Sequence, residues 1–249
     1  MHKKQAEDVK LIDIHREKSY YIEDLLQIMK ILRGEGGCPW DAEQDHHSIR
    51  NNFIEETYEV ADAIDRDDTE ALKEELGDVL LQVVFHAQME EEKGTFSFSD
   101  VTDGICRKLI ERHPHVFGDV KVSSTDDVLN NWDKIKQSSK KQTTASQTLR
   151  AVPGCLPALM RSQKVVSRAM KAGASPADDG EALADVNEKM DRLCLAVCGD
   201  KEVDAADAIG DLLLSVTALS KKLGIDAEEA LYRSTERYID DFEKTKISL

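Results

Sequence analysis

Apolar residues recur at helical spacing through most of the chain, and the residues that break helices gather in a few short segments. Residues 21–32 show the helical pattern clearly, and the GEGGCPWD segment that follows interrupts it with glycines and a proline. The pattern resumes through IRNNFIEETYEVADAIDRDD and TEALKEELGDVLLQVVFHAQMEEEKG. Since no segment requires a strand, the sequence predicts an all-α protein.

The ends of the predicted helices carry the usual capping residues. Asp68 and Thr69 are candidate N-caps of the long helix that starts there, and Gly94 is a candidate stop. The short RDDT turn therefore predicts two antiparallel helices, one on each side. Further helices are expected over residues 100–112 and across VLNNWDKIK.

The second half of the chain predicts four more helices after a change in composition. Residues 137–157 lose the apolar periodicity and gather Ser, Thr, Lys, Gly and Pro, as a linker does. We therefore expect an N-terminal module at residues 1–140, a linker at 141–158 and a C-terminal module at 159–249. The helical segments of the last module are LMRSQKVVSRAMKAG, EALADVNEKMDRLCLAVCG, DAADAIGDLLLSVTALSKKLG and DAEEALYRSTERYIDDFEK.

The two halves also resemble each other. GDVLLQVVFHA begins at Gly77, and GDLLLSVTALS begins at Gly210 with the same small, acidic and apolar order. This internal repeat predicts two tandem helical modules of one ancestry, with the LLLSVTAL stripe forming the core of the second.

Charge and cysteine usage exclude several classes of protein. A formal net charge of −16 would repel the backbone of DNA or RNA, so a nucleic-acid polymer is not an expected partner. The five cysteines are odd in number and lack CxxC spacing, which predicts free thiols in a reducing compartment. The N-terminal residues lack the apolar core of a secretory signal, and no stretch approaches the length of a membrane span. We expect a cytoplasmic protein without a membrane partner.

Carboxylates are concentrated on the two helices of the predicted hairpin. Glu55, Glu56 and Glu59 lie on the first helix, where residues three or four apart share a face. Glu75 and Asp78 form a pair at the same spacing on the second helix. If the helices pack antiparallel, these groups face each other and need cations to offset their repulsion. Oxygen-only ligands select hard ions, Mg²⁺ first and Mn²⁺ second.

A single ExxE on a helix is usually a solvated acidic face paired with lysines. Two observations favour a functional cluster here. Glu56 and Glu59 lie amid an apolar stripe of Phe53, Val60 and Ile64 that we expect in the core. Gly77, inside a helix beside Asp78, suggests a close approach of two backbones.

The EETYE and ELGD segments together resemble the EExxE and ExxD signature of the MazG-type nucleoside triphosphate pyrophosphohydrolases. GCPWD, RHPHVFGDV and NNWDKIK resemble further hallmarks of that family, and the likeness covers nearly the whole chain, including the tandem arrangement. The resemblance implies an all-α, usually dimeric enzyme that cleaves NTPs and dNTPs to the monophosphate and pyrophosphate.

The resemblance also implies roles for individual residues. Glu56, Glu59, Glu75 and Asp78 would bind Mg²⁺, and Glu55 would bind a further ion or orient the attacking water. The basic positions of the family's substrate-binding segments match Lys108, Arg112, Lys134 and Lys136.

Aromatic and histidine residues allow two readings each. Trp40 and Trp132 could stack on a base or ribose, although tryptophans more often anchor a core or an interface. His113 and His115 could cap a helix end and fix the loop, and a metal role suits them less in a hard-ion site.

The C-terminal copy has lost most of the acidic signature. The offset from Gly77 to Gly210 places Glu188, Lys189, Arg192, Ala208 and Asp211 at the positions of Glu55, Glu56, Glu59, Glu75 and Asp78. Lysine and arginine would repel Mg²⁺ where carboxylates attract it. We therefore expect the second module to serve packing, dimerisation or regulation rather than catalysis.

Three functions remain open from the sequence. The first is a pyrophosphohydrolase of broad NTP and dNTP specificity. The second is an enzyme of the same class directed at a single pyrimidine nucleotide, such as dUTP or dCTP, or at a damaged one. The third is a helical regulatory protein that binds nucleotides or partner helices without turnover.

Overall fold

The computed structural model describes residues 19–139, 144–199 and 203–246, and every regular element in these ranges is a helix. The chain divides into two compact units, and the division falls between Lys121 and Val122. The N-terminal segment on which the expectation of a cytoplasmic protein partly depends lies outside the described residues. No helix in the described part of the chain is both long and apolar enough to cross a membrane.

The first unit is built around one long helix, α4, Thr69–Glu92. Helices α1 (Ile22–Arg33), α3 (Arg50–Asp65) and α5 (Phe98–Arg112) all contact it. Two short helices, α2 (Pro39–Glu43) and α6 (Pro114–Phe117), complete the unit. Apolar residues of α1 and α4 form its core with Ile49, and the buried members are Met29, Ile49, Val84, Phe85 and Met89.

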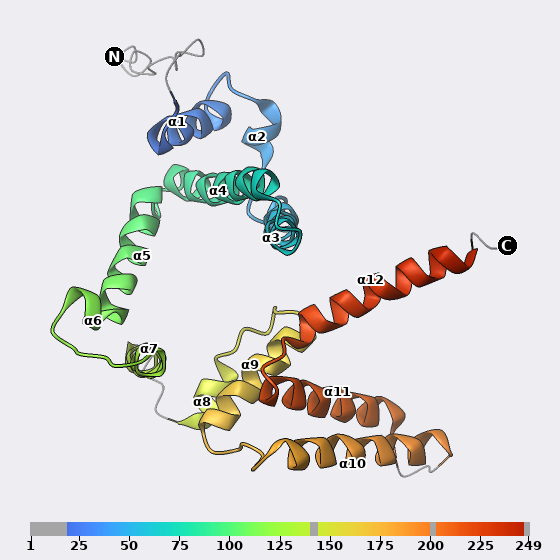
Figure 1. The fold of residues 1–249 in the computed structure, drawn as a ribbon. Helices are drawn as coiled ribbons and strands as arrows, with labels where there is room; N and C mark the ends of the chain where they lie inside the picture. The colour runs from blue at the N-terminus through green and yellow to red at the C-terminus, as the bar shows by residue number, and fades with distance from the viewer. Residues whose placement is uncertain (1–18, 140–143, 200–202, 247–249) are drawn as a thin grey trace, which may run out of the picture. The chain divides into compact units, whose positions relative to one another are not determined.

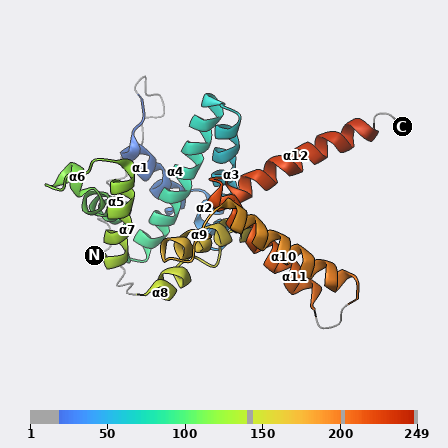
Figure 2. The ribbon, with the colours of Figure 1, turned by 60° about the horizontal axis from the view of Figure 1, so that its bottom comes forward.

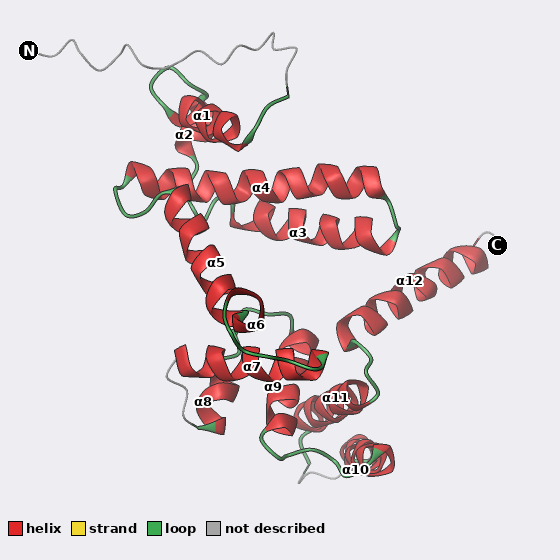
Figure 3. Cartoon of the chain, turned by 60° about the vertical axis from the view of Figure 1, so that its left-hand side comes forward, coloured by secondary structure: helices red, strands yellow, loops and turns green. Residues whose placement is uncertain are grey.

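The predicted hairpin of α3 and α4 is confirmed, and the two helices lie side by side (Figure 3). Asp67 turns the chain with a φ of 52°, and the Asp68 side chain caps α4 by accepting a hydrogen bond from the Ala71 amide at 3.1 Å. Gly94 ends α4 with a φ of 71°. These two helix ends therefore follow the local rules from which they were predicted.

The segment between α1 and α3 is fastened by one arginine. The Arg33 guanidinium donates to the carbonyl oxygens of Asp41 and Gln44 and to the carboxylate of Glu92, and it lies over the Phe85 ring. Only 7% of the Arg33 side chain is exposed. A buried charge requires such partners, so this one residue ties the GCPWD segment to α1 and α4.

The second unit contains α7 (Thr125–Ser139), α8 (Ala145–Arg150), α9 (Ala158–Lys171), α10 (Asp179–Val197), α11 (Ala205–Lys222) and α12 (Ala227–Lys246). Helices α10 and α11 form a second hairpin and lie side by side in both views (Figures 1 and 2). Helix α9 packs on α11 as α1 packs on α4, which parallels the internal repeat of the sequence.

The predicted linker at 141–158 differs from the structure in one respect. Helix α8 lies inside it, and Val152 is buried, so the segment contributes to the packing of the second unit. The division between the units falls after Lys121 rather than at residue 140, so α7 belongs to the second unit. The composition of the segment did not predict α8 because a short polar helix has no apolar periodicity of its own.

The expectation that the LLLSVTAL stripe forms a core is wrong for much of the stripe. Leu213, Leu214 and Val216 are exposed, whereas Ser215 and Thr217 are buried. The face that α11 buries carries small side chains, which allow close packing of helices. The hydroxyl groups of Ser215 and Thr217 donate to carbonyl oxygens of their own helix, so their burial leaves neither donor unsatisfied.

Candidate metal centre

The hairpin of α3 and α4 brings three of the predicted ligands together. Glu56 on α3 and both Glu75 and Asp78 on α4 offer carboxylate oxygens that all lie within 4.8 Å of one another. The three side chains are half-buried. In the described part of the chain, no other group of three acidic, histidine or cysteine side chains is arranged in this way. The predicted convergence of carboxylates across the hairpin is present.

Glu59 adds a fourth carboxylate next to this cluster. Burial raises the pKa of Glu56 above its usual range, and contact with the Glu59 carboxyl and the charges of Asp78, Glu59 and Glu75 raise it further. Burial also raises the pKa of Glu75, with the charges of Glu59 and Asp78 next in importance. The cluster is therefore self-repelling, and a cation among the oxygens would relieve that repulsion.

Glu55 lies apart from this group because it is one residue, or about 100°, around α3 from Glu56. Its side chain is exposed, and it is not part of the cluster of Glu56, Glu75 and Asp78. A role for Glu55 in binding a second ion or in orienting water remains a prediction.

Two supporting arguments from the sequence are wrong. Ile64 is 55% exposed rather than part of a core stripe, and the buried residue of α3 is its neighbour Ala63. A Cβ atom at Gly77 would meet nothing within 4 Å, so no backbone from the described part of the same chain approaches there. The acidic residues converge because α3 and α4 pack through small and half-buried residues, and Gly77 has no part in that.

The predicted substrate-binding residues fall in both units. Lys108 and Arg112 lie on α5, and Trp40, which is exposed, lies on α2. Trp132, Lys134 and Lys136 lie on α7 of the second unit, and the side chain of Lys134 lies outside what the structure describes. Their contribution to one nucleotide site remains a prediction. His113 does cap α5, since its Nδ1 lies 2.6 Å from the Leu109 carbonyl oxygen, while its ring contacts that of His115.

Sequence reasoning missed a histidine pair beside the hairpin. The Nδ1 atoms of His46 and His86 lie 2.7 Å apart, and His46 Nε2 lies 2.6 Å from a carboxylate oxygen of Glu90. Burial lowers the pKa of His86, and hydrogen bonds from Lys93, Thr95 and His46 lower the pKa of Glu90 to about 2. The two histidines are 40 residues apart, so only the tertiary structure reveals the pair.

The second hairpin has ion pairs where the first has its carboxylate cluster. The sequence predicted this loss of negative charge, because Lys189 and Arg192 replace two of the acids. Arg192 pairs with Asp211, and Lys189 pairs with Asp185 and Glu188. Ala208, at the position that corresponds to Glu75, has no exposed surface. The cations occupy the place where a metal ion would need negative charge, so this hairpin is not a metal centre of the same kind.

The repulsion within the cluster predicts that Glu56→Gln stabilises the protein when no divalent ion is present. A carboxyl whose pKa is raised in the folded state holds its proton more tightly there than in the unfolded chain. Ionisation above that pKa therefore lowers the free energy of unfolding, and the neutral amide avoids this loss. At pH 7 in a chelator, the Tm of Glu56→Gln should exceed that of the wild type.

Two controls accompany this measurement. The difference in Tm should shrink as the pH falls through the raised pKa of Glu56, and it should vanish below the ordinary glutamate value of 4.5, where Glu56 is protonated in both states. The exposed neighbour Glu55 provides the matched change, and Glu55→Gln should leave the Tm nearly unchanged. A lower Tm for Glu56→Gln at pH 7 would show that the carboxylates do not repel one another.

Comparison with known proteins agrees with this geometry. Residues 44–117 match the model of the MazG nucleotide pyrophosphohydrolase domain, and this range contains all five acidic residues of the predicted site. The chain is 42% identical over 221 residues to the nucleoside triphosphate pyrophosphohydrolase of Escherichia coli strain K12, covering 87% of this chain and 84% of that protein.

Two further relatives differ in how much of the chain they match. Identity is 38% over 229 residues to the nucleoside triphosphate pyrophosphohydrolase/pyrophosphatase MazG of Thermotoga maritima, covering 92% of this chain and 87% of that protein. It is 41% over 152 residues to the nucleoside triphosphate pyrophosphohydrolase of Mycolicibacterium smegmatis, covering 60% of this chain and 46% of that protein.

Proposed function

The chain belongs to the MazG nucleotide pyrophosphohydrolase family, and from this premise we propose that it hydrolyses nucleoside triphosphates to the monophosphate and pyrophosphate. The observation that carries the proposal is the convergence of Glu56, Glu75 and Asp78 within 4.8 Å. A regulatory protein without turnover has no need for a half-buried cluster of like charges, which opposes folding.

The donor set fits a hard divalent ion. Glu56, Glu75 and Asp78 offer oxygen ligands only, and Glu59 extends the set, so Mg²⁺ is the expected cofactor and Mn²⁺ its substitute. When bound, such an ion would neutralise the negative charge on the phosphate oxygens. The raised pKa values of Glu56 and Glu75 indicate that their ionised carboxylates destabilise the folded protein when no ion is bound.

The protein's own residues would then position the reactants. Water attacks the α-phosphorus, the bond from that phosphorus to the bridging oxygen breaks, and pyrophosphate leaves. Glu55 precedes Glu56 on α3 and would orient the water or bind a further ion. Lys108 and Arg112 on α5 would provide fixed positive charge for the triphosphate, together with Lys134 and Lys136. Trp40 and Trp132 would stack on the base or ribose.

We assign the second module a role in packing and homodimer formation. The ion pairs of Arg192 and Lys189 stand where the first module has ligands. Helix α12 extends away from α10 and α11 (Figures 1 and 2) and exposes apolar side chains, with Tyr238 at 72%. Exposed apolar faces of this kind favour a second copy of the chain as partner. We retain the tandem modules of residues 1–140 and 159–249 as sequence repeats in this proposal, whereas the compact units divide after Lys121.

The free cysteines support a reducing location, which we propose is the cytoplasm. All five cysteines are free thiols, and four of them are exposed. Exposed thiols persist in compartments that keep cysteine reduced.

Isotope labelling tests the reaction directly. In water enriched in ¹⁸O, with Mg²⁺ and a nucleoside triphosphate, we expect equal amounts of monophosphate and pyrophosphate, with the label in the monophosphate alone. Label in pyrophosphate or release of orthophosphate would place the attack on another phosphorus and contradict the proposal. Comparing kcat/KM for a panel of triphosphates separates broad from pyrimidine-directed specificity.

A further inference from the structure

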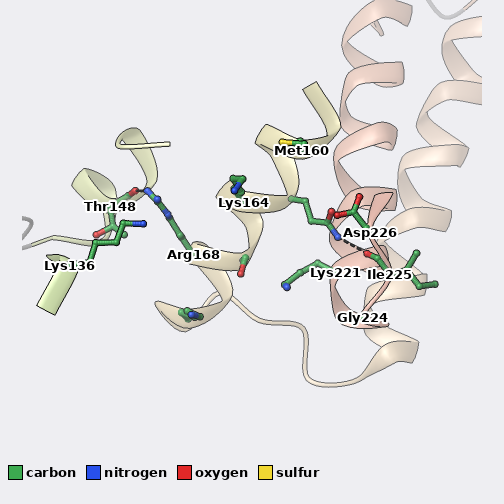
Figure 4. Close-up of a pocket in the computed structure, with 12 residues that line it drawn as sticks. Lys136, Thr148, Met160, Lys164, Arg168, Lys221, Gly224, Ile225 and Asp226 are labelled. Atoms are coloured by element: carbon green, nitrogen blue, oxygen red, sulfur yellow. Dashed lines mark hydrogen bonds between the residues drawn. The ribbon is translucent and has the colours of Figure 1, made fainter. Parts of the chain in front are cut away.

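We propose that a basic pocket in the second unit is a binding site for a small polyphosphate anion, either inorganic or carried by a nucleotide. The pocket has a volume of about 480 Å³ and lies between α7, α8, α9 and the segment after α11 (Figure 4). All its lining residues belong to the second unit, and none is part of the carboxylate cluster of the first. Lys136 is the one lining residue that the proposed function also assigns to triphosphate binding.

The charge of this pocket is opposite to that of the whole protein. Acidic residues outnumber basic ones by 49 to 33 in the chain. The pocket has a single acidic residue among its 12, whereas the basic ones are Lys136, Lys164, Arg168, Lys171 and Lys221. A sample with the composition of the chain would contain more acidic than basic residues, so the local potential of the pocket favours an anion.

The single acidic residue of the pocket is already engaged elsewhere. The Asp226 carboxylate accepts hydrogen bonds from the amides of Glu228 and Glu229 in the first turn of α12, at 3.0 and 3.1 Å. Its charge is thus stabilised by the helix N-terminus. By contrast, the ammonium groups of Lys164 and Lys221 have no hydrogen-bond or ion-pair partner within the described ranges of the chain.

The walls of the pocket are held in place by their own contacts. Gln163 donates to the Ile225 carbonyl oxygen at 2.5 Å and accepts from the Ala227 amide at 3.2 Å, which fastens the segment after α11 to α9. At the other end of the pocket, Arg168 donates to the Thr148 carbonyl oxygen. A site with fixed walls loses less entropy when it binds its ligand.

The chemistry of the pocket indicates a ligand with several negative charges. Lys164, Arg168 and Lys171 follow one another at spacings of four and three residues, so they share one face of α9. Lys221 faces them from the end of α11. A chain of linked phosphates can meet several such groups at once, and both ammonium and guanidinium bind phosphate oxygens well. The volume falls in the range of pockets for small molecules, and Met160 and Ile225 offer apolar surface for a nucleoside.

Calorimetric titration of the full chain with inorganic triphosphate, in a chelator, tests this proposal. Removal of divalent ions leaves the carboxylate cluster negative and unable to hold the anion, so binding reports the basic pocket. We expect saturable binding of one triphosphate per chain. The double change Lys164→Gln and Lys221→Gln should weaken it by about a hundredfold, since each lost charge-assisted bond removes on the order of tenfold.

Matched variants make the outcome decisive. Lys73→Gln with Lys244→Gln removes the same charge at exposed positions outside the pocket and should leave binding within about twofold, the size of weak surface effects. Asp78→Asn should also retain it, so failure of the proposed catalytic function would not affect this result. The single change Lys164→Gln covers the case in which the double variant does not fold.

Two results would overturn the proposal: no binding by the wild type in the chelator, or equal weakening by the pocket and control variants. The choice of probe then identifies the ligand. Equal affinity for inorganic triphosphate and a nucleoside triphosphate would show that the phosphates alone are recognised. Tighter binding of the nucleotide would show that the pocket also contacts the nucleoside.

Discussion

Asp78→Asn is expected to lower kcat for triphosphate hydrolysis by about three orders of magnitude, the scale on which loss of one key electrostatic group acts in enzymes. The amide keeps the size of the side chain and removes the charge. Asp78 is one of the three residues whose carboxylate oxygens lie within 4.8 Å of one another, so its charge is part of the field that would hold the cation. Steady-state assay of pyrophosphate release measures the effect.

The internal repeat provides a matched control for this change. Asp211 occupies the corresponding position in the second hairpin, where its carboxylate pairs with Arg192 on the surface. Asp211→Asn breaks an exposed ion pair worth at most about 1 kcal/mol and should leave kcat within about twofold. Loss of activity through Asp211 with retention through Asp78 would move catalysis to the second module and contradict the assignment.

Removal of divalent ions is expected to abolish turnover, with a fall in rate of at least about three orders of magnitude when the metal's charge stabilisation is lost. Without a cation, the carboxylates of Glu56, Glu59, Glu75 and Asp78 repel both one another and the triphosphate. Assay after dialysis against a chelator, followed by stepwise return of Mg²⁺, measures this dependence. Return of Mn²⁺ should restore activity too, because it accepts the same oxygen ligands.

A soft metal ion serves as the negative control for that assay. Oxygen ligands do not favour soft ions, so a thiolate-seeking ion such as Cu⁺ should not restore turnover. Full activity in the presence of excess chelator would mean that the carboxylate cluster works without a cation.

The helices and their ends could be predicted from the sequence because they depend on neighbouring residues. Asp68 as an N-cap and Gly94 as a helix stop follow from local hydrogen bonds and backbone conformation. The facing of Glu56 toward Asp78 also followed, since a short turn between two helices fixes their antiparallel pairing.

Predictions that depended on tertiary partners were less successful. Helical periodicity placed Ile64 and Leu213 in a core, but both are exposed, because the faces that pack in the two hairpins carry small residues such as Ala63 and Thr217. Gly77 was given a packing role that the open space beside it excludes. Periodicity identifies a face but does not identify which neighbour covers it.

Two features of the structure gave almost no signal in the sequence. The pair of His46 and His86 joins residues from distant segments that share no motif. The basic pocket left only a partial trace, the one-face spacing of Lys164 and Arg168 on α9, because Lys221 joins them only through the packing of α9 on α11.

Titration of the full chain with Mn²⁺, followed by the electron paramagnetic resonance of the free ion, tests whether the hairpin of α3 and α4 holds the metal. We expect saturable binding by the wild type and by Asp211→Asn, and its loss in Asp78→Asn and Glu56→Gln. Unchanged binding of Mn²⁺ by the last two variants would show that the ion is held elsewhere, and the assignment of this hairpin as the metal centre would be wrong.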